Sequence, residues 1–173
     1  EVANTALRDG LIAYDQRHGY RGPESRLPGK TLSAWTTELG KQRAISGLEP
    51  AIVTQVDKTG LQVLTKSGQT ETVAWDTMKW ARPFLNTNSM GAAPRQPSDV
   101  AQVGDLIRVQ RQDDGSLRFV QLPQAQSALV SLDPDNGAIR ALVGGFFPAP
   151  GDDGHATESG SDEDENNFAG LHE

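Results

Sequence analysis

The sequence predicts a mainly β protein with short helices, and three observations support that fold class. Between residues 51 and 122, five short stretches rich in β-branched and alternating apolar residues are separated by turn residues, a pattern typical of strands. Two stretches before them carry apolar residues at helical spacing. From Pro148 onward Gly, Asp, Glu, Ser and Asn dominate, and this composition favours disorder because it offers too little apolar surface to bury.

The charge of the chain is divided unequally. The formal net charge is −7 over 173 residues, but residues 151–173 contribute eight acids and no lysine or arginine. The remaining 15 acids nearly balance the 16 bases, so residues 1–150 are close to neutral. A nearly neutral domain lacks the excess of basic residues that a nucleic-acid-binding domain requires. Because the chain has no cysteine, disulfides and thiol chemistry are excluded.

Two helices are predicted near the start of the chain. Residues 2–14 carry apolar groups at spacings of four, four and three, and Gly19 ends that helix. A second short helix is marked by Leu32, Trp35 and Leu39. The segment between the helices contains prolines and glycines and is predicted to be irregular.

The strands are predicted at residues 51–56, 61–65, 70–75, 105–110 and 117–122. A single helical turn follows the third strand, and the last two strands form a returning hairpin. Three strands, one helical turn and a hairpin in fewer than about 80 residues are typical of a small five-stranded Greek-key barrel of the oligonucleotide/oligosaccharide-binding (OB) type. The fold class is therefore an OB-like barrel with an N-terminal helical linker and a disordered acidic tail.

Three further local features are predicted around the barrel. Asp76 is expected to cap the helical turn, which extends to Trp80. Residues 86–97 are rich in Gly, Pro and Asn and are predicted to be a loop. A second hairpin is predicted around Asn136-Gly137, with left-handed backbone at both turn positions.

Two stretches resemble the class A penicillin-binding proteins. They are Tyr14 to Pro23 (YDQRHGYRGP) and Ala128 to Phe146 (ALVSLDPDNGAIRALVGGF). In that family the first stretch lies on the approach to the transpeptidase domain, and the second forms the opening hairpin of that domain. The resemblance implies that the residues between them form the inserted, non-catalytic domain of the family.

The resemblance divides the chain into four parts. Residues 1–48 are expected to form a helical and irregular linker, and residues 49–124 the barrel. Residues 125–147 are expected to be the opening hairpin of a truncated transpeptidase domain. The resemblance ends there, and residues 148–173 are expected to be a disordered or appended acidic tail.

The resemblance also implies a function for the parent protein. The family consists of bifunctional enzymes that polymerise peptidoglycan strands and cross-link them, anchored in the inner membrane with a periplasmic part. This chain would be a regulatory docking domain that binds an outer-membrane lipoprotein activator and contacts the flanking glycosyltransferase and transpeptidase domains. Peptidoglycan itself is a further candidate partner.

No catalytic residue and no cofactor are predicted for this chain. A penicillin-binding transpeptidase needs a Ser-x-x-Lys motif, in which the lysine lies one helical turn from the nucleophile. The residues three positions before the five lysines offer no serine or threonine; they are Leu27, Glu38, Gln55, Val63 and Asp76.

Five residues are candidates for partner binding. They are Trp80, Arg82, Phe84, Arg95 and Arg21. Trp80 and Arg82 could offer an apolar contact and a charge to a partner, but a tryptophan beside a single helical turn more often plugs the bottom of a barrel. Arg21 could bind a partner carboxylate, but an arginine in an irregular segment commonly bonds its own carbonyls. We favour the structural interpretation for both Trp80 and Arg21.

No metal site is predicted. Asp162, Asp164, Asn166 and Glu173 match positions 1, 3, 5 and 12 of a calcium-binding loop. The flanking helices of such a loop are not predicted, and acidic low-complexity sequence produces such matches by chance.

The sequence offers some support for two other ligands of the barrel. Val103-Gly104-Asp105 before an alternating strand suggests an S1-like nucleic-acid-binding module, but residues 51–65 contain no aromatic residue for base stacking. No nucleic-acid partner is therefore expected. Alternatively, the barrel could bind glycan or stem peptide through loop residues, as related barrels bind oligosaccharides. That set is Arg82, Asn86, Asn88 and Arg95, with Phe84 for sugar stacking.

Overall fold

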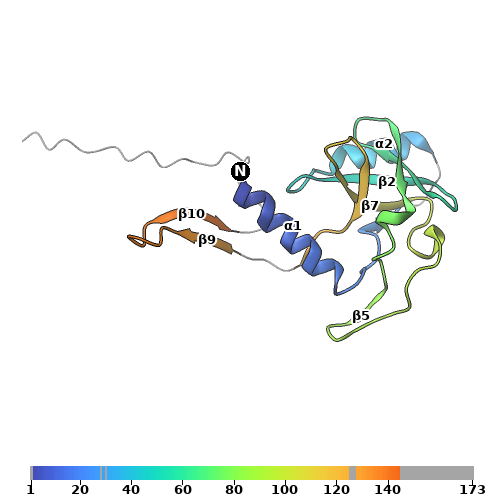
Figure 1. Cartoon of the computed structure of the whole chain (residues 1–173). Helices are drawn as coiled ribbons and strands as arrows, with labels where there is room; N and C mark the ends of the chain where they lie inside the picture. Colours follow the sequence, from blue (N-terminus) through green and yellow to red (C-terminus); the bar gives the residue numbers. More distant parts are fainter. Residues whose placement is uncertain (1, 28, 30, 125–127, 145–173) are drawn as a thin grey trace, which may run out of the picture.

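The computed structural model describes residues 2–27, 29, 31–124 and 128–144 (Figure 1). The acidic tail and the calcium-loop match at Asp162, Asp164, Asn166 and Glu173 lie outside the described residues. Among the described residues, no helix is long and apolar enough to cross a membrane.

Five strands close into a barrel, as the sequence predicts. They are β2 (Leu48–Val56), β3 (Gly60–Thr65), β4 (Thr70–Ala74), β7 (Asp105–Arg111) and β8 (Leu117–Val120). Strand β2 pairs antiparallel with β3 and β7, β3 with β4, and β7 with β8. A parallel contact between Val73 of β4 and Leu117 of β8 closes the barrel. This strand order is the Greek-key arrangement of an OB-type fold.

The barrel interior is filled by side chains that alternate inward along the strands. Phe119, Val63, Val73 and Val109 are all fully buried there. Met78 covers the end of this cluster from the turn after β4, which contains the 3₁₀ helix η1 (Trp75–Thr77). Because both walls of a small barrel contribute to one interior, each strand needs its apolar residues at every second position.

A second apolar cluster lies outside the barrel, beneath helix α2 (Leu32–Lys41). Trp35 and Leu39 of this helix pack on Ile52 and Leu106 of the sheet. The helix thereby covers a sheet face that would otherwise expose apolar side chains to water.

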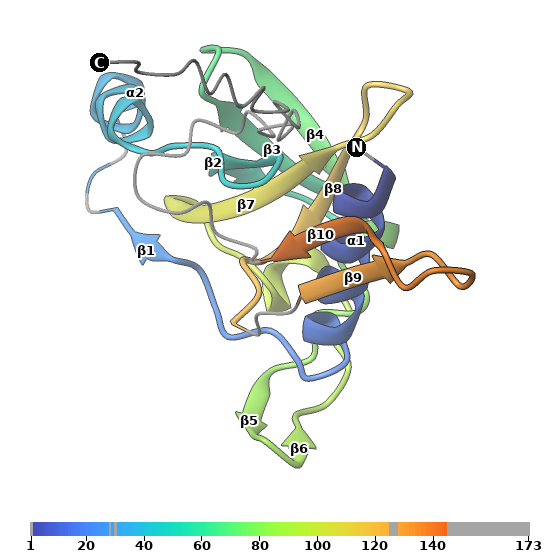
Figure 2. The same cartoon turned by 90° about the vertical axis from the view of Figure 1, so that its left-hand side faces the viewer.

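Helix α1 (Val2–Gln16) packs against the barrel through Leu11 and Ile12, which contact Leu48 and Val120. The hairpin of β9 (Ala128–Leu132) and β10 (Ile139–Gly144) lies beside the same helix (Figures 1 and 2). Helix α1 therefore lies between the barrel and this hairpin.

Short strands appear in segments that the sequence predicted to be irregular. Strand β1 (Ser25–Arg26) pairs with β7 and extends the sheet beyond the barrel. Strands β5 (Phe84–Asn86) and β6 (Ser89–Met90) form a small hairpin, and the 3₁₀ helix η2 (Pro97–Asp99) follows it. Strands of two or three residues are too short to show an alternating pattern.

Two local predictions were wrong. Asp76 does not cap the helical turn, because η1 begins at Trp75 and Ala74 occupies the capping position. The Asn136-Gly137 turn is not a two-residue turn, and only Gly137 has positive φ, of 71°. The turn is a longer loop in which Gly137 N–H donates to the Asp133 carbonyl at 2.8 Å. Asn136 Oδ1 instead accepts from Ala138 N–H at 2.9 Å, a bond that a side chain can make without left-handed backbone.

Candidate docking surface

The β5–β6 hairpin projects from the barrel, and its base is held by backbone bonds (Figures 1 and 2). Tyr20 N–H donates to the Arg82 carbonyl at 2.7 Å, and Phe84 N–H donates to the Tyr20 carbonyl at 2.9 Å. On the other side, Gly91 N–H donates to the Pro83 carbonyl at 2.7 Å. The hairpin is therefore fastened to the segment that follows α1, and its direction is fixed.

Gly19 makes this contact possible. Its φ is +99°, and a Cβ atom added there would lie 2.9 Å from the Arg82 carbonyl oxygen and 3.1 Å from Met90 Cγ. A side chain at this position would be strained by its backbone conformation and would press on the hairpin. The sequence places this glycine between a helix and Tyr20, but nothing local to it indicates the hairpin 60 residues away.

The projecting hairpin carries apolar groups that face solvent. Phe84 is 38% exposed and Leu85 is 61% exposed. Sequence reasoning identified Phe84 and missed Leu85, because a leucine within a short polar loop has no distinguishing pattern.

The segment that contains the hairpin carries basic residues, and its two acidic neighbours, Asp76 and Asp99, lie just outside it. Residues 77–98 contain Lys79, Arg82 and Arg95 and no acidic residue. Lys79 pairs with Asp76 at 2.6 Å, whereas Arg82 and Arg95 form no salt bridge with any described residue. Arg82 Nε donates to the Gly91 carbonyl at 2.9 Å, which orients its side chain along the hairpin. We call Arg82, Phe84, Leu85 and Arg95 the hairpin surface.

Trp80, which the sequence raised as a possible partner contact, is turned into the protein. Its ring packs on Tyr20 and Phe119 with centroid distances of 5.9 and 5.6 Å. Its Nε1 donates to the Phe119 carbonyl at 3.1 Å. Burial raises the pKa of the Tyr20 phenol beside it. These contacts give Trp80 a structural role at the end of the barrel.

Arg21 also makes internal contacts. Its Nη1 and Nη2 donate to Asp15 Oδ1 and Oδ2 at 2.9 and 3.1 Å, and Nη2 also donates to the Leu122 carbonyl at 2.7 Å. The Arg21 backbone N–H donates to Gln121 Oε1 at 3.1 Å, and Gln121 Nε2 donates to the Gly19 carbonyl at 2.8 Å. This node joins the end of α1 to the chain that leaves β8. Arg21 is therefore not part of the hairpin surface.

A second polar network lies on the barrel wall. Arg111 of β7 donates twice to Glu71 of β4, at 2.9 Å each, and once to Glu49 of β2 at 3.3 Å. The hydrogen bonds from Arg111 lower the pKa of Glu71 below its ordinary value. One side chain thus links three strands of the barrel.

Two of the residues proposed for glycan binding take part in local backbone bonds. Asn86 Oδ1 accepts the backbone N–H of Asn88 at 2.9 Å and shapes the turn of the hairpin. Arg95 lies on the connection after β6, where its backbone N–H is bonded to Asp99 Oδ2 at 2.9 Å. In the part of the chain that the structure describes, no group of three or more His, Cys, Asp or Glu could hold a metal ion.

A closed five-stranded barrel with a helix over one face and an appended hairpin defines an OB-type domain. The chain belongs to the penicillin-binding protein OB-like domain family, whose model matches residues 20–125. That range includes the barrel, β1, α2 and the hairpin surface.

Curated relatives show the same relationship over a longer stretch. The chain is 71% identical over 145 residues to penicillin-binding protein 1A of Pseudomonas aeruginosa, covering 84% of this chain and 18% of the relative. It is 38% identical over 151 residues to penicillin-binding protein 1A of Escherichia coli, with the same shares covered. The chain therefore spans less than a fifth of the length of these relatives.

A solved structure agrees with the fold. The crystal structure of penicillin-binding protein 1A from Haemophilus influenzae superposes with a TM-score of 0.63 and 35% sequence identity. The superposition covers 84% of this chain and 20% of that chain. The matched region is thus a small part of a larger protein.

Proposed function

We propose that this chain is the non-catalytic docking domain of a penicillin-binding protein 1A and that its hairpin surface binds an outer-membrane lipoprotein activator. The parent protein would polymerise and cross-link peptidoglycan from the periplasmic side of the inner membrane. Support for this parent comes from the family match and from the names of the relatives. The Ser-x-x-Lys motif of a transpeptidase is absent from the sequence, so the chemistry would belong to the flanking domains.

The observation that carries the docking proposal is the composition of the hairpin surface. Two exposed apolar side chains, Phe84 and Leu85, lie on the same connection as two arginines whose guanidinium groups form no salt bridge with a described residue. Apolar side chains and arginines are the groups that contribute most to protein–protein interfaces. The hairpin is also fixed at its base, so binding would not require ordering of a flexible loop.

The apolar and basic residues of the hairpin surface indicate which properties its partner needs. A protein with a shallow apolar recess bordered by carboxylates would accept the two apolar side chains and pair with Arg82 and Arg95. Desolvation of the apolar tip would supply affinity, whereas the charges would set orientation and association rate. Binding would therefore weaken moderately, without being abolished, as salt concentration rises.

The experiment is an isothermal titration of the 173-residue chain with the soluble part of the outer-membrane lipoprotein activator from the same bacterium. Leu85→Ser should weaken binding at least about tenfold, as expected for a central interface residue. Leu32→Ser is a matched control, because Leu32 is 59% exposed on α2 and lies outside the hairpin surface. The control should bind like the unaltered chain.

Variants that remove the arginine charges complete the test. Arg82→Gln together with Arg95→Gln should reduce both the affinity for the activator and the dependence of that affinity on salt. Arg17 is also exposed but lies outside the hairpin surface, so Arg17→Gln should change neither. Equal weakening by Leu85→Ser and Leu32→Ser, or no binding at all, would overturn the assignment of the hairpin surface.

A further inference from the structure

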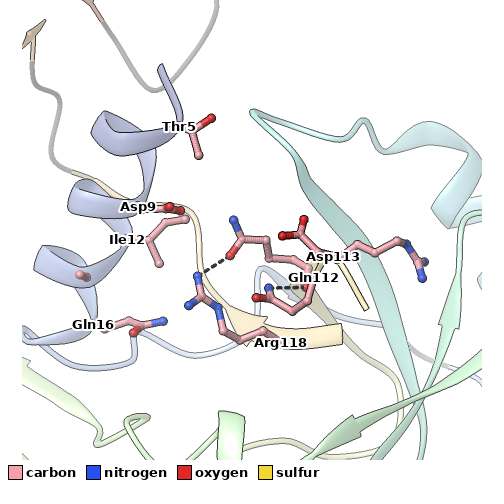
Figure 3. Close-up of a pocket in the computed structure, with 10 residues that line it drawn as sticks. Thr5, Asp9, Ile12, Gln16, Gln112, Asp113 and Arg118 are labelled. Atoms are coloured by element: carbon pink, nitrogen blue, oxygen red, sulfur yellow. Dashed lines mark hydrogen bonds between the residues drawn. The ribbon is translucent and has the colours of Figure 1, made fainter. Parts of the chain in front are cut away.

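A separate cleft lies between α1 and the hairpin of β7 and β8 (Figure 3). Its volume is about 560 Å³, within the usual range of small-molecule sites. It shares no lining residue with the hairpin surface. The lining is polar and comes from segments about 100 residues apart in the sequence, so folding is required to assemble it.

Arg118 of β8 supplies a positive charge on one wall of the cleft. One nitrogen of its guanidinium donates to Gln110 Oε1, whereas its Nε is buried and has no hydrogen-bond partner among the described atoms. Arg118 also forms no salt bridge with a described residue. The other arginine of the lining, Arg111, is already paired with Glu71 and Glu49. Nη1 of Arg118 makes no hydrogen bond with a described residue, so Arg118 is the cation of the lining that retains a donor for a carboxylate.

Negative charges border the same cleft from two sides. Asp9 lies on α1, and Asp113 lies on the turn between β7 and β8; both are exposed (Figure 3). Neither carboxylate forms a hydrogen bond or salt bridge with a described residue. Carboxylates in this position repel a ligand of uniform negative charge and attract an ammonium group.

The side-chain amides of Gln16 and Gln112 also line the cleft (Figure 3). An amide can both donate and accept hydrogen bonds, so these groups suit a ligand that carries peptide or carboxylate functions. The cleft thus combines one guanidinium that forms no salt bridge with a described residue, two carboxylates that likewise form none, and neutral amides, within a volume suited to a small molecule.

We propose that this cleft binds a small zwitterion, namely an amino acid or short peptide with free ends, whose carboxylate binds Arg118 and whose ammonium group binds Asp9 and Asp113. The proposal is independent of the docking function, because it involves other residues and another class of ligand. A phosphate or nucleotide fits poorly because the two aspartates would repel it.

The test uses the dipeptide Ala-Ala as probe and the 173-residue chain, with amide resonances followed by NMR. Free Ala-Ala should shift the amides of residues 110–113 and 118 and those of α1 near Asp9. N-acetyl-Ala-Ala lacks the ammonium group, and Ala-Ala amide lacks the carboxylate, so each should bind about tenfold more weakly. Weak binding of both blocked forms would show that both charges are recognised.

Variants assign each charge to its residue. Arg118→Gln should abolish the difference between Ala-Ala and its amide, and Asp9→Asn with Asp113→Asn should abolish the difference between Ala-Ala and its N-acetyl form. Arg95→Gln, on the hairpin surface, should preserve both differences. Circular dichroism confirms that each variant is folded; if Arg118→Gln does not fold, Arg118→Lys replaces it and should weaken binding by losing the two-pronged contact.

Several outcomes would overturn the proposal. Shifts confined to the hairpin surface, or no shifts up to the solubility limit of the dipeptide, exclude the cleft as its site. Equal binding of Ala-Ala and both blocked forms excludes recognition of a zwitterion. If inorganic phosphate shifts the same amides more strongly than Ala-Ala, the cleft binds anions instead.

Discussion

Asp15 and Arg21 form a two-bond salt bridge at 2.9 and 3.1 Å that ties the last turn of α1 to the segment that follows it, and Arg21 also donates to the Leu122 carbonyl in the chain that leaves the barrel. Asp15 is almost completely buried, with 4% of its surface exposed. Arg21→Met leaves this carboxylate without its cation and also removes the bond to the Leu122 carbonyl. We expect the free energy of unfolding to fall by about 3 kcal/mol, measured by urea denaturation.

Two companion variants make this prediction specific. Arg17→Met removes an exposed arginine from the same region and should change stability by no more than about 0.5 kcal/mol. Combining Asp15→Asn with Arg21→Met should cost less than the sum of the two single changes, because the buried charge is gone. Additive costs would mean that the two side chains do not act as a pair.

Gly60 and Gly10 should respond oppositely to replacement by alanine. Gly60 has φ of +152°, and a Cβ there would lie 2.0 Å from the Val73 carbonyl oxygen, so Gly60→Ala must push β3 and β4 apart. We expect a loss of about 3 kcal/mol or more. Gly10 is in α1 with open space around it, so Gly10→Ala should raise stability by up to about 1 kcal/mol. Thermal unfolding measures both, and a tolerated Gly60→Ala would contradict the β3–β4 register.

The network at Glu71 should make stability depend on pH. Hydrogen bonds from Arg111 lower the pKa of Glu71 in the folded protein, whereas the unfolded chain keeps the ordinary glutamate pKa of about 4.3. The resulting stabilisation is complete above that value and is lost as pH falls through the lowered pKa. Glu71→Gln should therefore flatten the loss of stability between about pH 5 and pH 3.

The size of this effect should be small, about 1 kcal/mol or less, because the Arg111 side chain is 40% exposed and solvent screens the pair. Denaturation at several pH values measures it. In an Arg111→Gln background, Glu71→Gln should no longer alter the acid limb of the curve. An unchanged effect in that background would assign the pH dependence to another group.

Trp80→Phe distinguishes a structural role from a partner contact. The variant loses the bond from Nε1 to the Phe119 carbonyl but keeps an aromatic ring against Tyr20 and Phe119. Stability should fall by about 1 kcal/mol, while affinity for the lipoprotein activator stays the same. Weaker activator binding at unchanged stability would add Trp80 to the docking surface.

The barrel could be predicted from the sequence because its strands are long enough to alternate. Every second residue along such a strand points inward, as Val63 and Val109 do, and that period is visible without a structure. The helical stripe of Leu32, Trp35 and Leu39 is equally local, and the predicted helix forms there; Trp35 and Leu39 are buried, whereas Leu32 is exposed. Strand β1 has only two residues, and no pattern in so short a stretch identifies a strand.

The surfaces were harder to predict, because exposure and charge pairing depend on distant segments. Arg82 and Phe84 were identified from the sequence, but Leu85 became significant only when the hairpin was seen to project. Nothing in the sequence around Arg118 indicates a binding site. Its importance depends on α1, which lies about 100 residues away and supplies the opposite wall of the cleft.

The bonds from Gly19 and Arg21 to Gln121 have a mechanical consequence. Gly19 and Arg21 precede the barrel and Gln121 follows it, so these bonds hold the entry and the exit of the chain at one place. Tension between the two flanking segments would act first on these bonds to Gln121. The bonds would break one after another. Strands β2 and β7 would carry little load until these bonds had broken. Breaking these bonds would therefore increase the distance between the two flanking segments while the barrel remains folded.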